Sequence, residues 1–497
     1  ELESFFAAAN QAVHLANPDR VIKPVDGDYD PPAPGLPDNH CYCGWYNGHG
    51  VDLGKLHKGY WQKVKPGWRY GCGEFGAEGL DPVNIMRRHY PPEWLSQTPE
   101  DERTWTPDRI VKAQTGRFHY MWFETQHTLV DWVAASQAHQ ARMTRLMTEA
   151  FRRDSQMASF AIHLFIDAFP SGWMKAIMDV ERQPKPAYFA YREALTPLMA
   201  NLRTDRHAFF AGETVTLEAW VCNDLDVVPD GLELSYQLEL HGEVIAAQRG
   251  PADVARCNST FQGFLHFGVP AVRSRATLVA RLALIDKKGR VLHDTSVDLE
   301  VFPTLGRATK RVCVIGPPQS AAARLAVEMN LQTIPLEAVE PGDVILISDI
   351  SEGLEVITPW VTHGAIAVLL DLPPGAYEIA GGPVQVVPCG MNPRHFCGRA
   401  PGHPMVADLR PDDFWFWYDA AAGYVTPLLA TTVTAPGWTP ILTSGNGDWS
   451  GMWGPAFAVA EKTHGEGYFR ICQLALADRT RHNPVAWLFA HRLLGGQ

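Results

Sequence analysis

Trp68-Arg-Tyr-Gly-Cys-Gly-Glu-Phe-Gly-Ala-Glu-Gly79 joins a short predicted strand to a glycine-rich exit. The strand, Arg69 to Cys72, follows a Pro-Gly turn. Glu74 stands at its C-terminal end between two glycines, which leave room for a ligand. Barrels of parallel strands carry their catalytic groups at such ends. Glu74 is therefore a candidate functional carboxylate, with a surface residue in a glycine loop as the alternative.

Strands and helices alternate over the first 200 residues. Apolar periodicity predicts helices at 2–16, 53–64, 129–153 and 186–195, and strands at 21–25, 40–46, 69–72 and 160–165. On the long helix, the expected apolar stripe includes Val130, Val133, Ala134 and Leu146. Segment 80–128 has weak periodicity and is expected to form a lid or to line the site. About four strand–helix units predict half of an eight-fold barrel.

Four motifs in this region occur in a recognisable order. They are Asn17-Pro-Asp-Arg20, His40-Cys-Tyr-Cys-Gly-Trp-Tyr46, Gly73-Glu-Phe-Gly76 and Arg182-Gln-Pro-Lys-Pro-Ala-Tyr188. Their order resembles that of glycoside hydrolase family 2, which includes β-galactosidases, β-glucuronidases and β-mannosidases. The resemblance covers about residues 1–200, with weaker similarity beyond. It implies that residues 1–203 form the second half of a catalytic TIM barrel, and it does not name the sugar.

The resemblance also implies roles for single residues. Glu74 matches the family's nucleophile at the end of the seventh strand, and Tyr42 matches a tyrosine that hydrogen-bonds that nucleophile. Trp45 and Tyr46 match residues that support the site. At the end of the fifth strand, Asp26 and Asp28 either bind a sugar hydroxyl or cap a turn.

The pattern departs from the family around the eighth strand. His163 stands where the family usually has Trp, four residues before Asp167, and it either contacts the sugar or belongs to the core. In β-glucuronidases an Asn-x-Lys pair binds the substrate carboxylate. Trp173-Met-Lys175 keeps the lysine and lacks the asparagine, which weakens a uronide interpretation. The candidate substrate-binding residues here are His40, His163, Asp167, Trp173 and Lys175.

The chemistry requires two carboxyl groups. A retaining glycosidase holds a nucleophile and an acid/base about 5–5.5 Å apart. Glu74 must be ionised, which a phenol donor such as Tyr42 favours, whereas the acid/base must start protonated. The family's acid/base follows an Asn at the end of the fourth strand, upstream of the first predicted helix. Glu1 stands too close to that helix for the family spacing, and Glu78 is expected in a solvated loop.

We therefore expect the acid/base and the first four strands on a separate or cleaved N-terminal segment that completes the barrel. A half barrel has open strand edges, which proteins in water do not leave bare.

The middle and last thirds predict two further domains. Short runs with period-two alternation at 214–220, 234–240, 276–284 and 296–301 predict an immunoglobulin-like β-sandwich over 204–303. A packing role is favoured for it, with a carbohydrate-binding module as the alternative. Buried strands at 311–316, 344–347 and 365–370 predict a flavodoxin-like, doubly wound α/β domain over 304–497.

This last domain resembles class I glutamine-amidotransferase-like domains. An active one needs a Cys at a strand-to-helix elbow, with His and Glu nearby. Leu370-Asp-Leu-Pro-Pro374 has no Cys, and Cys389 lies in a Pro-Gly context. An inactive scaffold for oligomer contacts is expected. Gly316-Pro-Pro lacks the glycines of a phosphate loop, so no cofactor is expected.

Composition limits the partners. The 497 residues carry a net charge of −12, which argues against nucleic acid or an anionic membrane. No apolar run reaches the length of a membrane helix, and no signal peptide is visible, so a cytoplasmic or periplasmic location is expected. The nine cysteines lack CxxC pairs and suit free thiols. A metal at His40, Cys41 and Cys43 is not expected, because no second ligand pair is present.

The sequence thus predicts a retaining exo-β-glycosidase, most plausibly of the β-galactosidase type. Specificities of the β-glucuronidase or β-mannosidase type are alternatives. A non-catalytic carbohydrate-binding or scaffold subunit is a second hypothesis, since the acid/base is not found, and an amidotransferase-like enzyme is a third. The expected partners are a carbohydrate substrate, the barrel-completing segment and further copies of the chain.

Overall fold

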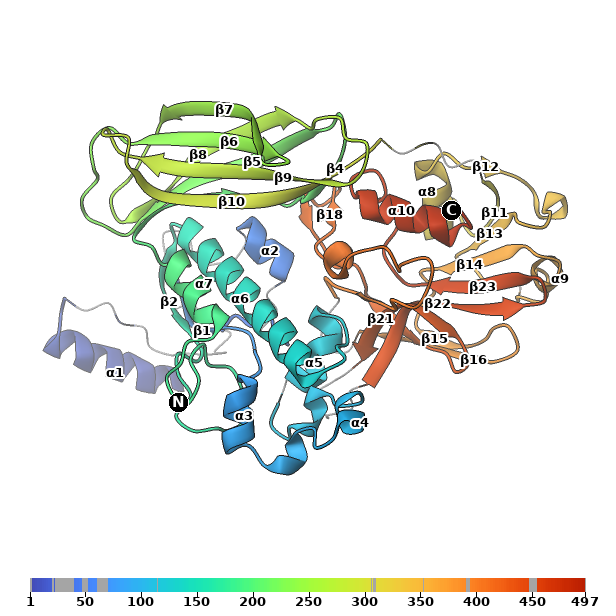
Figure 1. The fold of residues 1–497 in the computed structure, drawn as a ribbon, viewed down its shortest axis with the longest axis horizontal. Coiled ribbons are helices and arrows are strands. Elements are labelled where there is room, and N and C mark those ends of the chain that lie inside the picture. Colours follow the sequence, from blue (N-terminus) through green and yellow to red (C-terminus); the bar gives the residue numbers. More distant parts are fainter. Residues whose placement is uncertain are drawn as a thin grey trace.

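The computed structural model describes residues 2–19, 22, 40–46, 52–59, 70–113, 115–304, 306, 310–351, 353–389, 394–446 and 454–496. Three parts follow one another along the chain: an α/β part, a β-sandwich and a second α/β part (Figure 1). Apart from residue 22, the predicted strand at 21–25 lies outside the described residues, as do the candidates Asp26 and Asp28.

The first part contains parallel strands and helices. Its elements are α1 (Leu2–Ala16), α2 (Leu53–Lys58), β1 (Tyr70–Phe75), α3 (Val83–His89), α4 (Pro99–Glu102), α5 (Thr115–Trp122), α6 (Leu129–Arg153), β2 (Met157–Ile162) and α7 (Pro186–Ala194). Strand β1 pairs in parallel with β2, and Cys41 forms a parallel bridge with Phe75 of β1. Strands β1 and β2, which match two predicted strands, therefore pair in parallel, and segment 80–128 forms helices. The strand predicted at 40–46 was wrong except for the bridge at Cys41, because a turn follows at 43–46.

Helix α6 is the main structural element of this part. Thr128 caps its N-terminus by accepting from the N–H of Asp131 at 3.1 Å, and two arginines end it, as the helix dipole favours. Its buried face includes Trp132, Met143 and Phe151, whereas Val130 is 59 % exposed. The predicted stripe was wrong at Val130 and at the exposed Ala134, because buried His139, Gln140 and Thr144 share the inner face and hydrophobicity alone does not detect them.

Two sheets form the middle part, and all their strand pairs are antiparallel except the parallel pair of β4 with β10. One contains β3 (Leu198–Arg203), β5 (Thr214–Asn223) and β8 (Asn258–Gly268); the other contains β4 (Ala208–Phe210), β10 (Val291–Phe302), β9 (Ala276–Ile285), β6 (Glu233–Leu240) and β7 (Glu243–Pro251). Alternating residues such as Val215, Leu217 and Leu282 fill a core shared by both sheets. Strand β3 pairs with β5, so the sandwich begins at Leu198, before the predicted boundary at 204.

The last part is built on one large mixed sheet. Its parallel strands are β12 (Gln332–Thr333), β11 (Arg311–Ile315), β13 (Val344–Ile347), β14 (Ile366–Leu370) and β23 (Gly467–Cys472), and the predicted strands β11, β13 and β14 are confirmed. Antiparallel strands extend it: β22 (Gly454–His464), β20 (Thr431–Thr434), β21 (Thr439–Asn446), β17 (Gly398–Arg399), β16 (Pro383–Pro388) and β15 (Gly375–Glu378). The remaining elements are α8 (Ala321–Glu328), α9 (Thr358–Thr362), α10 (Pro484–Leu493), β18 (Tyr418–Asp419) and β19 (Tyr424–Val425).

An ion pair and a hydrogen bond join the last part to the first. Arg399 contacts Glu124 at 2.7 Å, and buried His395 contacts Asp52 at 2.9 Å. Asp52 is also the N-cap of α2, accepting from Lys55 N–H at 3.0 Å, so the last part helps to hold the start of that helix. Among the described residues, no helix is both long and apolar enough to span a bilayer.

Trp132 and Val130 of α6 offer a matched test of this packing. Trp132 is fully buried and donates to Trp105 O at 3.1 Å, which ties segment 80–128 to the helix. We expect Trp132→Ala to lower the free energy of unfolding by about 3–5 kcal/mol. Val130→Ala should stay within about 0.5 kcal/mol. Chemical denaturation monitored by circular dichroism measures both, and equal losses would contradict the position of the buried face.

Candidate active site

Three side chains surround the carboxylate of Glu74. The Tyr42 hydroxyl donates to Oε2, and Nδ1 of His40 lies 3.2 Å from the same oxygen. Nδ1 of His163 lies 3.8 Å from Oε1. The side chain of Glu74 remains 33 % exposed, so it is held in place and still open to a ligand.

The backbone around Glu74 is fixed from both sides. The N–H of Cys41 donates to Glu74 O at 2.8 Å, and the N–H of His163 donates to Phe75 O at 2.9 Å. Phe75 is fully buried and points away from the site, as alternation along a strand requires. A side chain at Gly76 would come within 2.6 Å of His163 O, so only glycine allows this close approach.

Two of the side chains beside Glu74, Tyr42 and His163, are neutral near pH 7. Burial, and then the adjacent Glu74 carboxylate, raise the pKa of Tyr42, which therefore stays a protonated donor. Burial lowers the pKa of His163, and the attraction of Glu74 only partly offsets that effect. The rings of Trp45 and Tyr46 pack on Tyr42 with centroids 5.0 and 5.3 Å away, which limits its rotation.

Lys175 lies between two indoles. Its Nζ is 3.8 Å from the ring centroids of both Trp45 and Trp173, a geometry that favours cation–π attraction. Burial lowers the pKa of Lys175 to about 8, although Glu78 and Glu74 pull it upward. Trp173 is 44 % exposed, so its indole closes the lysine off while presenting a ring to solvent.

Glu78 is buried, and the expectation of a solvated loop was wrong. It is 3 % exposed and accepts from the Thr115 hydroxyl at 3.0 Å. The chain turns inward after Gly76, where Gln140 of α6 donates to Ala77 O at 3.0 Å. Sequence distance from Glu74 gave no information about this inward turn.

Asp167 belongs to a different cluster of charges. It is buried, and burial raises its pKa to about 6, partly offset by Lys185 and reinforced by Asp81. Lys185 contacts Asp81 at 3.0 Å and donates to Gly79 O at 3.0 Å. Asp167 therefore lies among the residues that hold the loop after Glu74. Tyr42, His40 and His163, in contrast, contact Glu74 itself.

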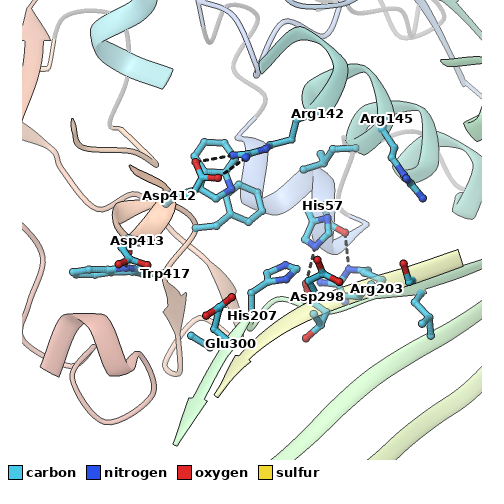
Figure 2. A pocket seen from close by; sticks show the side chains of 18 of the residues that line it. His57, Arg142, Arg145, Arg203, His207, Asp298, Glu300, Asp412, Asp413 and Trp417 are labelled. Atoms are coloured by element: carbon cyan, nitrogen blue, oxygen red, sulfur yellow. Dashed lines mark hydrogen bonds and ion pairs between the residues drawn. The ribbon is translucent and has the colours of Figure 1, made fainter. Parts of the chain in front are cut away.

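A large cavity lies elsewhere, where the three parts meet (Figure 2). Its volume is about 760 Å³, and α6, β10 and residues 410–417 contribute to its walls. None of the candidate residues that the structure describes lines it. Sequence reasoning missed it because its walls come from three separate domains, so no local motif marks it. The size of the cavity does not make it the candidate active site. The carboxylate that is held by neighbouring side chains is that of Glu74, which lies outside the cavity.

The described part of the chain contains no arrangement of side chains that favours a metal site or a reactive thiol. No group of three or more His, Cys, Asp or Glu side chains is placed there to hold a metal ion. All nine cysteines are free, including Cys41 and Cys43, whose sulfurs lie 3.7 Å apart. Cys389 is buried, and burial raises the pKa of its thiol, unlike an activated nucleophile.

Comparisons with known proteins give partial likenesses. No family model and no curated protein matches the chain. Among solved structures, a β-D-mannosidase from Dictyoglomus thermophilum is 17 % identical over 57 % of this chain and 33 % of its own, with a TM-score of 0.38. An exo-chitosanase from Amycolatopsis orientalis is 17 % identical over 54 % and 30 %, with a TM-score of 0.34. A β-glucuronidase from Bacteroides uniformis is 14 % identical over 55 % and 26 %, with a TM-score of 0.21.

These three similar structures are β-glycosidases, and the chain resembles them over part of its length. It spans about a third or less of each. Because the TM-scores are below 0.5, the activity proposed below rests on the geometry around Glu74.

The buried ammonium of Lys175 gives a pH test. In the folded protein Lys175 loses its proton near pH 8, below the ordinary lysine value of 10.5, so the unfolded state binds more protons in this interval. Stability must then rise with pH. Between pH 7 and 10, the wild type should gain up to about 2 kcal/mol over Lys175→Met. Urea denaturation at both pH values measures this gain. Exposed Lys112→Met is the control and should keep the wild-type slope; a parallel profile for Lys175→Met would contradict the assignment.

Proposed function

We propose that this chain carries the nucleophile of a retaining exo-β-glycosidase, and that the nucleophile is Glu74. The observation that carries the proposal is a part-exposed carboxylate at the end of a parallel strand, with Tyr42 donating to one oxygen. A surface glutamate in a glycine loop would not have two histidines and a buried tyrosine converging on it.

The two oxygens of Glu74 have different surroundings. Oε2 contacts Tyr42 and His40, whereas the nearest of these groups to Oε1, Nδ1 of His163, is 3.8 Å away. Oε1 therefore keeps more of its lone-pair density and attacks the anomeric carbon. As the glycosyl–Glu74 ester forms, the C–O bond to the leaving group breaks and the leaving oxygen takes a proton from a second carboxyl group. The resulting carboxylate then takes a proton from the water that cleaves the ester.

The second carboxyl group is proposed to come from a β/α segment that pairs with β2. Strand β2 pairs only with β1 in the described part of the chain, and Ala158, Ser159 and Ala161 on it are exposed. Phe165 and Phe169 just beyond it are 50 % and 65 % exposed. An open parallel edge with apolar residues beside it suits strand addition.

The sugar is proposed to be a terminal β-galactoside, with β-mannoside and β-glucuronide as the alternatives to be tested. Lys175 does not favour a uronide, because its ammonium already lies between Trp45 and Trp173. The exposed ring of Trp173 is a surface on which a sugar can stack.

Trapping the covalent intermediate tests the nucleophile without needing the acid/base. A 2,4-dinitrophenyl 2-deoxy-2-fluoro-β-glycoside has a leaving group that departs unprotonated. Incubation should add one glycosyl mass to the peptide containing Glu74, as peptide mass spectrometry would show. Glu74→Gln should lose this label and reduce aryl-glycoside turnover by about four orders of magnitude or more.

Glu100→Gln is the matched control, because Glu100 is exposed at the start of α4, and it should label like the wild type. Label on another residue, or full turnover by a folded Glu74→Gln protein, would refute the proposal. Saturable sugar binding with no label and no turnover, even with the completed barrel, would favour the non-catalytic subunit instead.

The open edge of β2 has its own test. The amide hydrogens of residues 157–162 should exchange much faster in the chain alone than those of buried β14. Protein purified from its source should show a second β/α polypeptide, or a longer chain, by native mass spectrometry, together with protected β2 amides. Slow exchange of β2 in the monomeric chain would show that this edge is already covered and would remove the partner proposal.

A further inference from the structure

The cavity at the junction of the three parts has the size of a small-molecule site. Its volume is about 760 Å³. One wall is α6, a second is strand β10 of the sandwich, and the third is the segment from Arg410 to Trp417 (Figure 2). All three walls carry polar side chains, and the rings of Trp415 and Phe416 lie among them.

The guanidinium groups of the walls already have carboxylate partners. Arg142 contacts Asp412 at 2.6 Å, as a dashed line shows in Figure 2, and Arg145 contacts Glu149 at 2.7 Å. The other pairs are Arg275 with Asp413 at 2.6 Å, Arg410 with Glu300 at 2.8 Å, and Arg203 with Glu218. An anion entering the cavity would compete with these carboxylates, so the walls do not favour an anionic ligand.

Other groups in the walls are still available for hydrogen bonds. The side chains of Ser296 and Asp298 on β10 are exposed and form no hydrogen bond or ion pair with the described part of the chain. Nε2 of His57 lies 2.8 Å from Thr204 O, so this nitrogen must be the donor. Nδ1 of a neutral His57 is then an acceptor without a donor among the described residues, but it is buried and lies out of reach of a ligand in the cavity.

The aromatic wall adds a flat surface. Trp415 is half-buried and stacked on Phe416, with centroids 4.6 Å apart and planes 15° apart. The guanidinium of Arg142 lies 5.6 Å from the Trp415 centroid and is held by Asp412. Carboxylate and hydroxyl acceptors, fixed guanidinium donors and an indole together match the hydroxyls and C–H faces of a sugar ring.

We propose that this cavity is a saccharide-binding site for a neutral sugar of one or two rings, separate from Glu74. An anionic sugar is disfavoured by the paired walls and the carboxylate of Asp298. A wholly apolar ligand would desolvate the ion pairs without replacing their water. The proposal does not depend on the activity of Glu74, because none of the residues around Glu74 lines the cavity.

Isothermal titration of the full chain with lactose, cellobiose and β-1,4-mannobiose tests the proposal. Glu74→Gln protein is used throughout so that no sugar is hydrolysed. Saturable binding of at least one disaccharide is expected. Asp298→Asn should weaken it about tenfold or more, because a charged acceptor is lost, and Ser296→Trp should abolish it by filling the cavity.

Asp294→Asn is the matched control, since Asp294 is exposed on the same face of β10 but does not line the cavity, and its affinity should be unchanged. Thermal melting confirms that each variant is folded. Equal affinity in Ser296→Trp would place the sugar elsewhere and overturn the proposal. So would binding of inorganic phosphate in place of the disaccharides, or no disaccharide binding at millimolar concentrations.

Discussion

Two backbone hydrogen bonds on either side of Glu74 are the constraint on which the candidate site depends. Cys41 N–H bonds Glu74 O, and His163 N–H bonds Phe75 O, at 2.8 and 2.9 Å. Each of these donors belongs to a segment that also carries a side chain of the site, Tyr42 in one case and His163 in the other. Strand pairing therefore sets the distances between side chains, and a register shift of one residue would turn Glu74 into the core and Phe75 toward solvent.

Buried charged residues help to hold the backbone and side chains around Glu74 in place. Lys175 is held by two indoles, Glu78 by Thr115, and Lys185 by Asp81 and Gly79 O. Buried charges of this kind contribute little net stability, but removing one partner leaves the other uncompensated, which is costly. They specify where the chain turns after Gly76, and that turn leaves the Glu74 carboxylate open on one side.

The sequence predicted the local features of this protein better than the long-range ones. Helix α1, helix α6, and strands β11, β13 and β14 follow from apolar periodicity. The contact of Tyr42 with Glu74 was implied by the resemblance to glycoside hydrolase family 2, whereas His163 was left open between a sugar contact and a place in the core. The buried state of Glu78 and the grouping of Asp167 with Lys185 depend on tertiary packing, which spacing does not encode. The inner face of α6 was misjudged at Val130 because polar residues with buried partners share it. No sequence motif marks the cavity, because the residues of its walls are far apart in sequence.

Helix α6 shows how the two candidate sites are related physically. On one face, His139 Nε2 contacts Gly44 O at 2.8 Å, and Gln140 donates to Ala77 O and Lys175 O, all in the backbone that surrounds Glu74. On another face, Arg142, Arg145 and Glu149 line the cavity at the domain junction. The placement of this single helix of 25 residues therefore bears on the backbone around Glu74 and on the walls of the cavity alike.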